Sequence, residues 1–155
     1  MLRILLICSG NTCRSPMAEA LFKAKCEESG LADQINILSA GTHALGSAPA
    51  SGGALRAMSR RGLDLASHRA RQLEPEFVQA ADLILTMTKA HKNTVLSFMP
   101  EAAEKVYTLA EFAGVEQDIA DPFGGSDEIY EVCATNIREL LDNAWEKIAD
   151  LAGKK

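Results

Sequence analysis

Residues 2–16 read L-R-I-L-L-I-C-S-G-N-T-C-R-S-P, an apolar run followed by a short polar loop and a proline. The apolar run over residues 2–7 is typical of a buried β-strand. Ser15 and Pro16 indicate the start of a helix, with Ser15 as the N-cap and Pro16 in the first turn, where the missing N–H is not needed. The sequence therefore predicts a strand, a tight loop and a helix in direct succession.

The predicted loop begins with a thiol, Cys8, and carries a guanidinium six residues later, on Arg14. A loop that curls into a helix start directs several backbone N–H groups at one point, and the helix dipole adds positive potential there. The natural ligand of such a loop is a tetrahedral oxyanion, two of whose oxygens a planar guanidinium can bind. The residues expected to bind phosphate are Ser9, Gly10, Asn11, Thr12, Cys13 and Arg14.

The same positive field favours the thiolate form of Cys8, and Ser15 is placed to donate a hydrogen bond to the sulfur. A thiolate below a bound phosphate can attack in line and form a phosphocysteine, while the loop amides and Arg14 stabilise the phosphate oxygens. We expect no metal and no cofactor, because the backbone and the arginine supply the positive charge. The simpler alternative is that Cys8 is a small buried residue at the end of a strand.

A leaving group needs a proton, and the best candidate to supply it is Asp121. This residue begins D-P-F-G-G-S over residues 121–126, in which proline fixes the backbone and the glycines allow an exposed turn. The alternative is a solvated aspartate in an ordinary turn. A Walker-type loop is excluded because the lysine of that motif is missing. A zinc site is not expected, because Cys8 and Cys13 are five residues apart and no histidine has the spacing of a zinc ligand.

Strand and helix patterns alternate along the chain, which favours an α/β fold. We expect a single three-layer domain over residues 1–155, with a four-stranded parallel sheet, helices on both faces and the phosphate-binding loop after the first strand. The expected strands cover residues 2–7, 35–38, 82–87 and 105–108, and the expected helices include residues 16–29, 54–61 and 89–98. A helical stripe near the C-terminus is predicted to be core: Ile129, Val132, Cys133, Ile137, Leu140, Leu141, Ala144, Ile148 and Leu151.

The chain resembles the low-molecular-weight protein tyrosine phosphatase family over essentially its whole length. The resemblance is carried by I-C-S-G-N-T-C-R-S-P-M-A-E (7–19), S-A-G-T (39–42), S-H-R-A-R-Q-L (67–73) and D-P-F (121–123). It implies that Cys8 is the nucleophile, that Arg14 binds phosphate, and that Asp121 is the general acid and later the base that activates water. It also implies a hydrogen-bond network that shapes the loop and tunes the thiol, formed by Asn11, Ser15, Ser39 and His68.

Two positions depart from the pattern of many tyrosine phosphatases of this family, which carry a bulky aliphatic residue in the loop and D-P-Y at the acid. Here these positions are Thr12 and Phe123. Together with T-M-T-K-A-H-K over residues 86–92, they resemble the bacterial branch that removes phosphate from protein arginine. A threonine hydroxyl can orient water or exclude a flat aryl ring. We therefore expect Thr12 and Phe123 to select phosphoarginine, with phosphotyrosine as the alternative substrate.

Two other functions share parts of this pattern. Thioredoxin-coupled arsenate reductases resemble the chain around residues 8–15, but they need further cysteines on a mobile segment, and residues 82–98 contain none. A non-enzymatic oxyanion-binding module would not need Cys8, Ser15 and Asp121 together. Under peroxide, Cys13 is predicted to form a disulfide with Cys8 that switches off catalysis and protects the nucleophile, as related phosphatases do. Packing of Cys13 behind the loop is the alternative.

Composition limits the partners. The net charge of −5 makes nucleic acid an unexpected partner, and no apolar run is long enough to span a membrane. Four cysteines without secretory context favour a reducing cytoplasm. The expected partners are a phosphorylated protein substrate and inorganic phosphate. Five arginines form a basic region of mostly solvated charges, some of which can steer a phosphorylated substrate: Arg56, Arg60, Arg61, Arg69 and Arg71.

Overall fold

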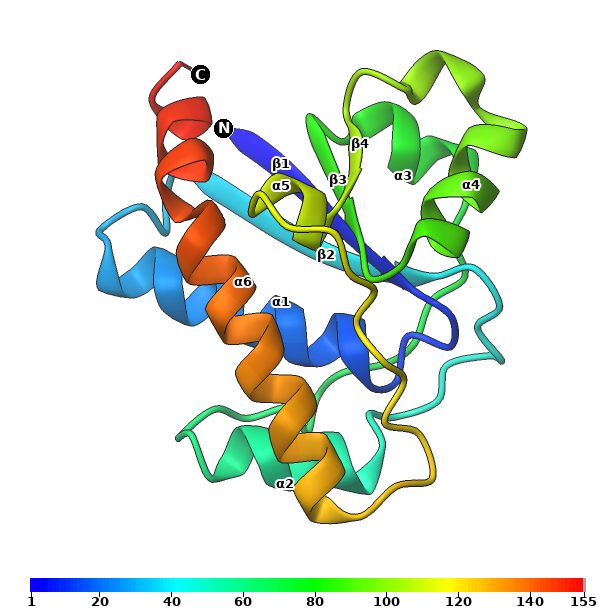
Figure 1. Ribbon diagram of the computed structural model, residues 1–155, viewed down its shortest axis with the longest axis vertical. Coiled ribbons are helices and arrows are strands. Elements are labelled where there is room, and N and C mark those ends of the chain that lie inside the picture. Colours follow the sequence, from blue (N-terminus) through cyan, green and yellow to red (C-terminus); the bar gives the residue numbers. More distant parts are fainter. Residues whose placement is uncertain (155) are drawn as a thin grey trace.

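The fold is built on one parallel sheet of four strands, and the computed structural model describes residues 1–154 (Figure 1). The strands are β1 (Leu2–Cys8), β2 (Ile35–Gly41), β3 (Leu83–Thr86) and β4 (Val106–Thr108), in the spatial order β2-β1-β3-β4. The helices are α1 (Arg14–Glu28), α2 (Gly52–Ser59), α3 (Pro75–Ala80), α4 (Lys89–Phe98), α5 (Leu109–Phe112) and α6 (Asp127–Gly153), with a 3₁₀ turn at Pro100–Ala102. The predicted domain end at Lys155 lies outside the described residues.

Alternate residues of β1 belong to two apolar cores, one on each face of the sheet. Ile4 and Leu6 pack in the core that includes residues of α1, α2, α5 and α6. Leu5 and Ile7 pack in the core that includes residues of α3 and α4. Both faces of the sheet are buried, as expected for parallel strands joined by helical crossovers. The predicted α/β fold with a four-stranded parallel sheet and helices on both faces is therefore confirmed.

Two of the boundaries that differ from prediction lie beside the loop, whereas α2 lies two residues earlier than expected. Ser15 is not the N-cap of α1, because Cys13 occupies that position and Ser15 lies buried in the first turn. The Ser15 hydroxyl is hydrogen-bonded to Asn11 and Cys8 instead of a helix amide. The second strand does not end at residue 38 but continues to Gly41, because residues 39–41 pair in register with the last residues of β1.

The apolar stripe of α6 is correct over the middle of the helix and wrong at its beginning. Ile129 and Val132 are exposed, whereas the residues that follow each of them, Tyr130 and Cys133, are buried in the core. In the first turns of α6 the buried face is therefore displaced by one residue from the predicted stripe. Helix α5 was not predicted, although Thr108 and Glu111 supply the capping box that begins it.

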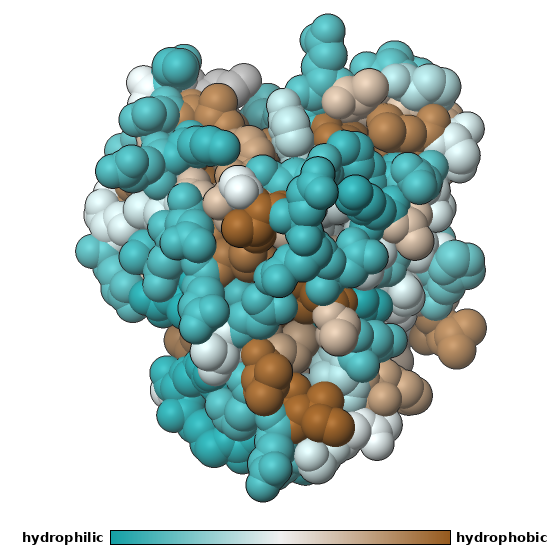
Figure 2. Space-filling model, viewed as in Figure 1, coloured by the Kyte–Doolittle hydropathy of each residue, from teal (hydrophilic) through white to brown (hydrophobic). Residues whose placement is uncertain are grey.

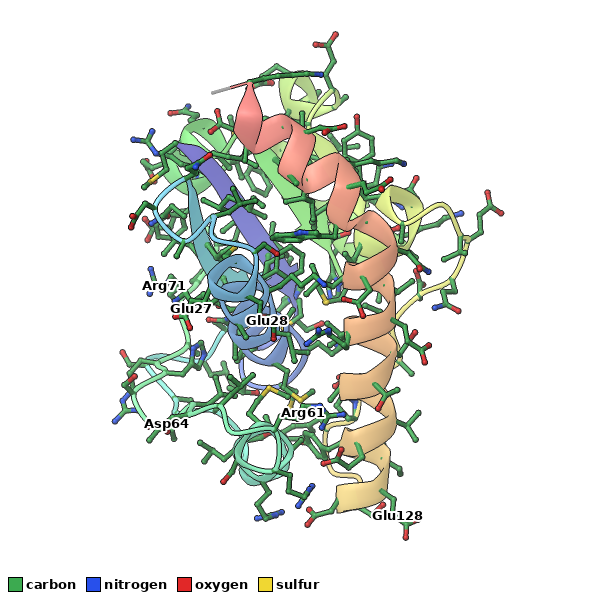
Figure 3. All side chains as sticks on the ribbon, turned by 90° about the vertical axis from the view of Figure 1, so that its left-hand side faces the viewer. Glu27, Glu28, Arg61, Asp64, Arg71 and Glu128 are labelled. Atoms are coloured by element: carbon green, nitrogen blue, oxygen red, sulfur yellow. The ribbon has the colours of Figure 1, made fainter. Side chains whose placement is uncertain are left out.

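Ion pairs join α2 and the residues that follow it to the first turns of α6. Arg56 and Arg60 pair with Asp127, and Arg60 and Arg61 pair with Glu131. Figure 3 shows Arg61 between these two helices. Three of the five arginines considered for substrate steering therefore hold the helices together, on a surface where charged and apolar residues alternate (Figure 2).

The loop after β1 lies at the end of the sheet opposite to the two chain termini (Figure 1). Segments from neighbouring strands meet it there, since the N–H of Thr42 donates to the carbonyl of Cys8 and the N–H of Met87 donates to the carbonyl of Ile7. The carboxyl end of a parallel sheet is where open α/β folds place ligands. None of the helices formed by residues 1–154 has the length and apolar character needed to cross a bilayer.

Candidate active site

The backbone of the loop turns sharply at Asn11, which has φ = 57° and is fully buried. Asparagine tolerates this left-handed conformation better than most residues. Both of its oxygens accept hydrogen bonds: Nε2 of His68 donates to the Asn11 carbonyl at 2.7 Å, and the backbone N–H of Arg71 donates to Oδ1 at 3.0 Å. The loop is thus fixed to the segment around residues 68–71, which is far away in the sequence.

A chain of hydrogen bonds links Glu19 to the thiol of Cys8, with the side-chain amide of Asn11 donating in both directions. Ser39 Oγ donates to Oε1 of Glu19 at 2.6 Å and therefore accepts from Nδ2 of Asn11 at 3.0 Å. The same Nδ2 donates to Ser15 Oγ at 2.8 Å. Ser15 keeps its own proton for the sulfur of Cys8, 2.9 Å away. This arrangement leaves the Ser15 hydroxyl as a hydrogen-bond donor to the sulfur of Cys8.

Arg14 lies beside the thiol with a guanidinium that is only partly bonded. Its side chain is buried, Nη1 donates to the carbonyl of Ile119 at 2.9 Å, and Nη2 lies 3.6 Å from Oδ2 of Asp121. Nε is buried and has no hydrogen-bond partner among the described residues. A buried N–H without a partner is costly, and an oxyanion in the loop would satisfy it.

The predicted catalytic residues line one cleft of about 350 Å³, whereas Ser9 and Asn11, which were also expected to bind phosphate, do not line it. Cys8 and Arg14 lie in it with the carboxylate of Asp121, whose side chain is half exposed. The N–H of Phe123 donates to Oδ1 of Asp121 at 3.1 Å, which fixes the carboxylate in a tight turn. The remaining lining residues are Gly10, Thr12, Cys13, His43, Leu45, Ala48 and Phe123.

The mouth of the cleft is apolar and carries one aromatic ring among its lining residues. Leu45 is 87% exposed and Phe123 is 73% exposed, so both side chains extend into solvent. Thr12 also lines the cleft, with Oγ1 3.7 Å from Sγ of Cys13. A substrate in the cleft therefore meets two apolar side chains and the side chain of a threonine.

Cys13 is bonded on the side of the loop that faces α2 and α6. Its sulfur lies 3.3 Å from Oγ of Ser51 and 3.3 Å from the hydroxyl of Tyr130. Burial, reinforced by the hydrogen bond to Cys13, raises the pKa of Tyr130 to about 12. Burial also raises the pKa of Cys133 to about 12, although Arg14 opposes this. The four cysteines are free thiols, so the disulfide between Cys8 and Cys13 stays a prediction.

Sequence reasoning missed two residues that contact the loop network. One is Glu19, the acceptor at the end of the chain described above, although it is the last residue of the motif over residues 7–19. The other is His91, whose Nε2 lies 2.8 Å from Oγ of Ser9. Ser9 itself does not line the cleft. Among residues 1–154, no group of three or more His, Cys, Asp or Glu side chains is placed to hold a metal ion.

Comparisons with known proteins agree with this arrangement. A family model described as low molecular weight phosphotyrosine protein phosphatase matches residues 3–152. The chain is 40% identical over 147 residues to a protein-arginine-phosphatase of Geobacillus stearothermophilus, which covers 94% of this chain and 95% of that one. It is 42% identical over 139 residues to a protein-arginine-phosphatase of Bacillus subtilis, with 89% and 91% covered. It is 39% identical over 148 residues to the low molecular weight protein-tyrosine-phosphatase PtpB of Staphylococcus epidermidis, with 91% and 95% covered.

Solved structures show the same fold. A mutant of the YwlE arginine phosphatase with a phosphorylated active-site serine has a TM-score of 0.90 at 38% identity, with 96% of each chain covered. A low molecular weight protein tyrosine phosphatase from T. tengcongensis has a TM-score of 0.90 at 40% identity, with 95% of this chain and 99% of that one covered. The similarity therefore extends over nearly all of the sheet and its helices.

Proposed function

Because the chain belongs to the low molecular weight phosphotyrosine protein phosphatase family and is a protein phosphatase, we propose that it removes phosphate from arginine side chains of proteins. In this proposal Cys8 is the nucleophile, Arg14 binds the phosphoryl group and Asp121 is the general acid. The observation that carries it is the hydrogen-bond chain that ends on the sulfur of Cys8, in the same cleft as Arg14 and Asp121.

The first step forms a bond between sulfur and phosphorus. The thiolate of Cys8 attacks the phosphorus in line, and the phosphorus–nitrogen bond of phosphoarginine breaks. Asp121 gives its proton to the departing nitrogen, and the arginine side chain leaves as a guanidinium cation. Arg14 and the loop amides bind the equatorial oxygens as their charge rearranges. The Arg14 Nε that lacks a partner among the described residues is the donor that this step would satisfy.

The second step returns the enzyme to its starting form. The carboxylate of Asp121 accepts a proton from a water molecule, whose oxygen attacks the phosphorus and breaks the sulfur–phosphorus bond. Inorganic phosphate leaves, and Cys8 is a thiolate again. The structure of the YwlE mutant with a phosphorylated active-site serine supports a covalent phosphoenzyme in the family.

The choice of phosphoarginine depends on the walls of the cleft. Sequence identity does not separate the substrates, since the arginine phosphatases are 40% and 42% identical and the tyrosine phosphatase PtpB is 39% identical. Thr12 places a hydroxyl at the centre of the loop, and Leu45 and Ala48 form an aliphatic wall suited to the methylene groups of an arginine. Phosphotyrosine is the second candidate, favoured by the similarity to the tyrosine phosphatase PtpB.

The substrate is tested by kinetics on matched phosphoarginine and phosphotyrosine peptides with the wild type and a Thr12→Ile variant. We expect the wild type to prefer phosphoarginine, and Thr12→Ile to shift the ratio of kcat/KM values towards phosphotyrosine by about tenfold or more. Thr135→Ile, at an exposed position of α6, is the matched control and should leave the ratio unchanged. An isoleucine variant that keeps its phosphoarginine turnover would exclude Thr12 as the selector.

The chemical roles are tested by two further variants. Cys8→Ser should abolish turnover of p-nitrophenyl phosphate and keep phosphate binding, and a non-enzymatic binding module would instead show no wild-type turnover. Asp121→Asn should lower kcat by about 10²-fold or more on phosphoarginine and less on p-nitrophenyl phosphate, whose leaving group needs less protonation. Equal losses on both substrates would contradict a role for Asp121 as general acid.

Reduction of arsenate with thioredoxin is disfavoured by the position of the remaining cysteines. Cys26 and Cys133 are buried in α1 and α6, and Cys133 donates to the carbonyl of Ala120. Neither lies on an exposed loop from which it could pass a disulfide to another protein. Arsenate-dependent consumption of reduced thioredoxin would overturn this conclusion. The remaining partners follow from the proposed reaction: a phosphorylated protein enters the cleft, inorganic phosphate leaves it, and nucleic acid has no role.

A further inference from the structure

Ser9, the residue after the proposed nucleophile, is hydrogen-bonded to a histidine that does not line the cleft. Its hydroxyl lies 2.8 Å from Nε2 of His91, which stands in the first turn of α4 and is buried. The other ring nitrogen of His91, Nδ1, lies 2.9 Å from Oγ1 of Thr88. Thr88 is the N-cap of α4, and its Oγ1 also accepts the backbone N–H of His91. The imidazole therefore bridges a helix start and the active-site loop.

The imidazole of this bridge is neutral at ordinary pH. Burial, reinforced by the positive charge of Arg14, lowers the pKa of His91 to about 4. Asp118 and Asp121 oppose this shift and His43 adds to it, so these are the charged or titratable groups that act on the ring. A neutral imidazole has one donor nitrogen and one acceptor nitrogen. It therefore accepts a hydrogen bond from one hydroxyl and donates one to the other, which fixes the orientation of both.

The hydrogen bond between His91 and Ser9 fixes the start of the loop, whereas the hydrogen bonds to Asn11 fix its middle. Asn11 is held by His68 and by the backbone of Arg71, which follow β2 in the chain. Ser9 is held by His91 of α4, a helix that packs on the opposite face of the sheet from α1. The loop is therefore anchored at its first turn and at its middle by elements that come from different parts of the chain.

We propose that His91 is a positioning residue for phosphoryl transfer, which acts through the hydroxyl of Ser9 to fix the direction of the backbone N–H groups at the start of the loop. This inference rests on the proposed role of the loop in catalysis. Small displacements of groups that orient reacting atoms reduce rates strongly, even when the displaced group does not touch the substrate. A role in orientation lowers kcat more than it weakens binding of the product phosphate.

The test compares two amide substitutions that each keep one half of the bridge. In His91→Gln the side-chain amide reaches the position of Nε2 and can still bond Ser9. In His91→Asn the amide reaches only the position of Nδ1 and can bond Thr88 but not Ser9. With p-nitrophenyl phosphate we expect His91→Asn to lose about tenfold in kcat and His91→Gln to stay within about threefold of the wild type. The inhibition constant of inorganic phosphate should change by less than about threefold in both.

A second route uses Ser9→Ala, which removes one oxygen atom and leaves His91 in place. We expect this variant to match His91→Asn, and the double variant Ser9→Ala/His91→Asn to be no slower than either single one, because they break the same bond. Equal losses in His91→Asn and His91→Gln, additive losses in the double variant, or full activity of Ser9→Ala would each overturn the proposal.

The choice of substrate separates this inference from the proposed function. Because p-nitrophenyl phosphate carries neither arginine nor tyrosine, the result does not depend on which phosphorylated residue is the substrate. Cys8→Ser is measured in the same assay. If that variant turned over substrate at the wild-type rate, the proposed nucleophile would be wrong whatever the His91 variants did. If only Cys8→Ser is inactive and Ser9→Ala is fully active, the proposed function stands and the role of His91 fails.

Discussion

Acidification from about pH 7 to about pH 4.5 is expected to destabilise the wild-type chain by about 2 kcal/mol more than a His91→Gln variant. The cause is the neutral imidazole buried against the active-site loop. Its pKa in the folded state is about 4, against an ordinary value of 6.5. In this pH range the unfolded chain takes up a proton at His91 and most folded molecules do not. Stability therefore falls as the pH decreases from 6.5 towards 4.

The magnitude follows from the two pKa values. Near pH 7 the imidazole is mostly neutral in both states, so it contributes almost nothing to the difference. Near pH 4.5 the imidazole is almost fully protonated in the unfolded state and only partly protonated in the folded state. This difference shifts the unfolding equilibrium towards the unfolded state by nearly two powers of ten. Each power of ten corresponds to about 1.4 kcal/mol, which gives the net value of about 2 kcal/mol after the small contribution near pH 7 is subtracted.

The assay is urea unfolding with a reductant present, followed by the fluorescence of Trp145, the single tryptophan of the chain. The free energy of unfolding is measured for both proteins at both pH values. All titratable groups other than His91 are present in both proteins, so the comparison isolates the contribution of this imidazole. Equal acid-induced losses in the wild type and in His91→Gln would refute the claim that burial keeps this imidazole neutral.

Three further outcomes are expected. Gly53→Ala should destabilise the fold by about 1–3 kcal/mol in thermal unfolding, because its Cβ would clash with the ring of Tyr130. Gly52→Ala is the control, because a Cβ there meets only a flexible side chain. Equal melting temperatures of the two variants would contradict the close packing at Gly53. Cys133 should resist alkylation near pH 8 in the native protein and react in urea, since burial raises its pKa to about 12; fast native labelling would disprove its burial. Arg61→Ala should lower the free energy of unfolding by less than about 1 kcal/mol, because the ion pair of Arg61 with Glu131 of α6 is partly exposed. A larger loss in urea unfolding would contradict this weak contribution.

The sequence predicted the parts of the site that are local in the chain. Cys8 and Arg14 are fixed by a strand and a helix that flank one short loop, so their relation follows from the pattern of residues 2–16 alone. The helix start was misplaced by the same pattern. Ser15 has the chemistry of an N-cap, but its hydroxyl is already bonded to Asn11 and Cys8, and capping statistics do not include such competing partners.

Residues that reach the site from a distance could not be derived in the same way. His68 was assigned through a resemblance to a family, and nothing in its neighbourhood indicates that it bonds a carbonyl 57 positions earlier. His91 was not predicted as a site residue, because its neighbours in the sequence do not distinguish it from a surface histidine in the first turn of a helix. Only the arrangement of β1 beside β3 brings it next to Ser9, and strand order is a property of the whole fold.

The same strand order explains how an aspartate on a distant loop reaches the cleft that contains the thiol. Met87, just after β3, donates its N–H to Ile7 at the end of β1 and accepts the N–H of Ile119 through its carbonyl. The carbonyl of Ile119 then accepts Nη1 of Arg14. One backbone segment therefore aligns the arginine that binds phosphate and, two residues later, the carboxylate of Asp121. Because Arg14 and Asp121 share this support, a substitution that displaces residues 119–121 must disturb phosphate binding and proton transfer together, whereas Asp121→Asn removes the proton donor and its ion pair with Arg14 but leaves the bond of Arg14 to Ile119 in place.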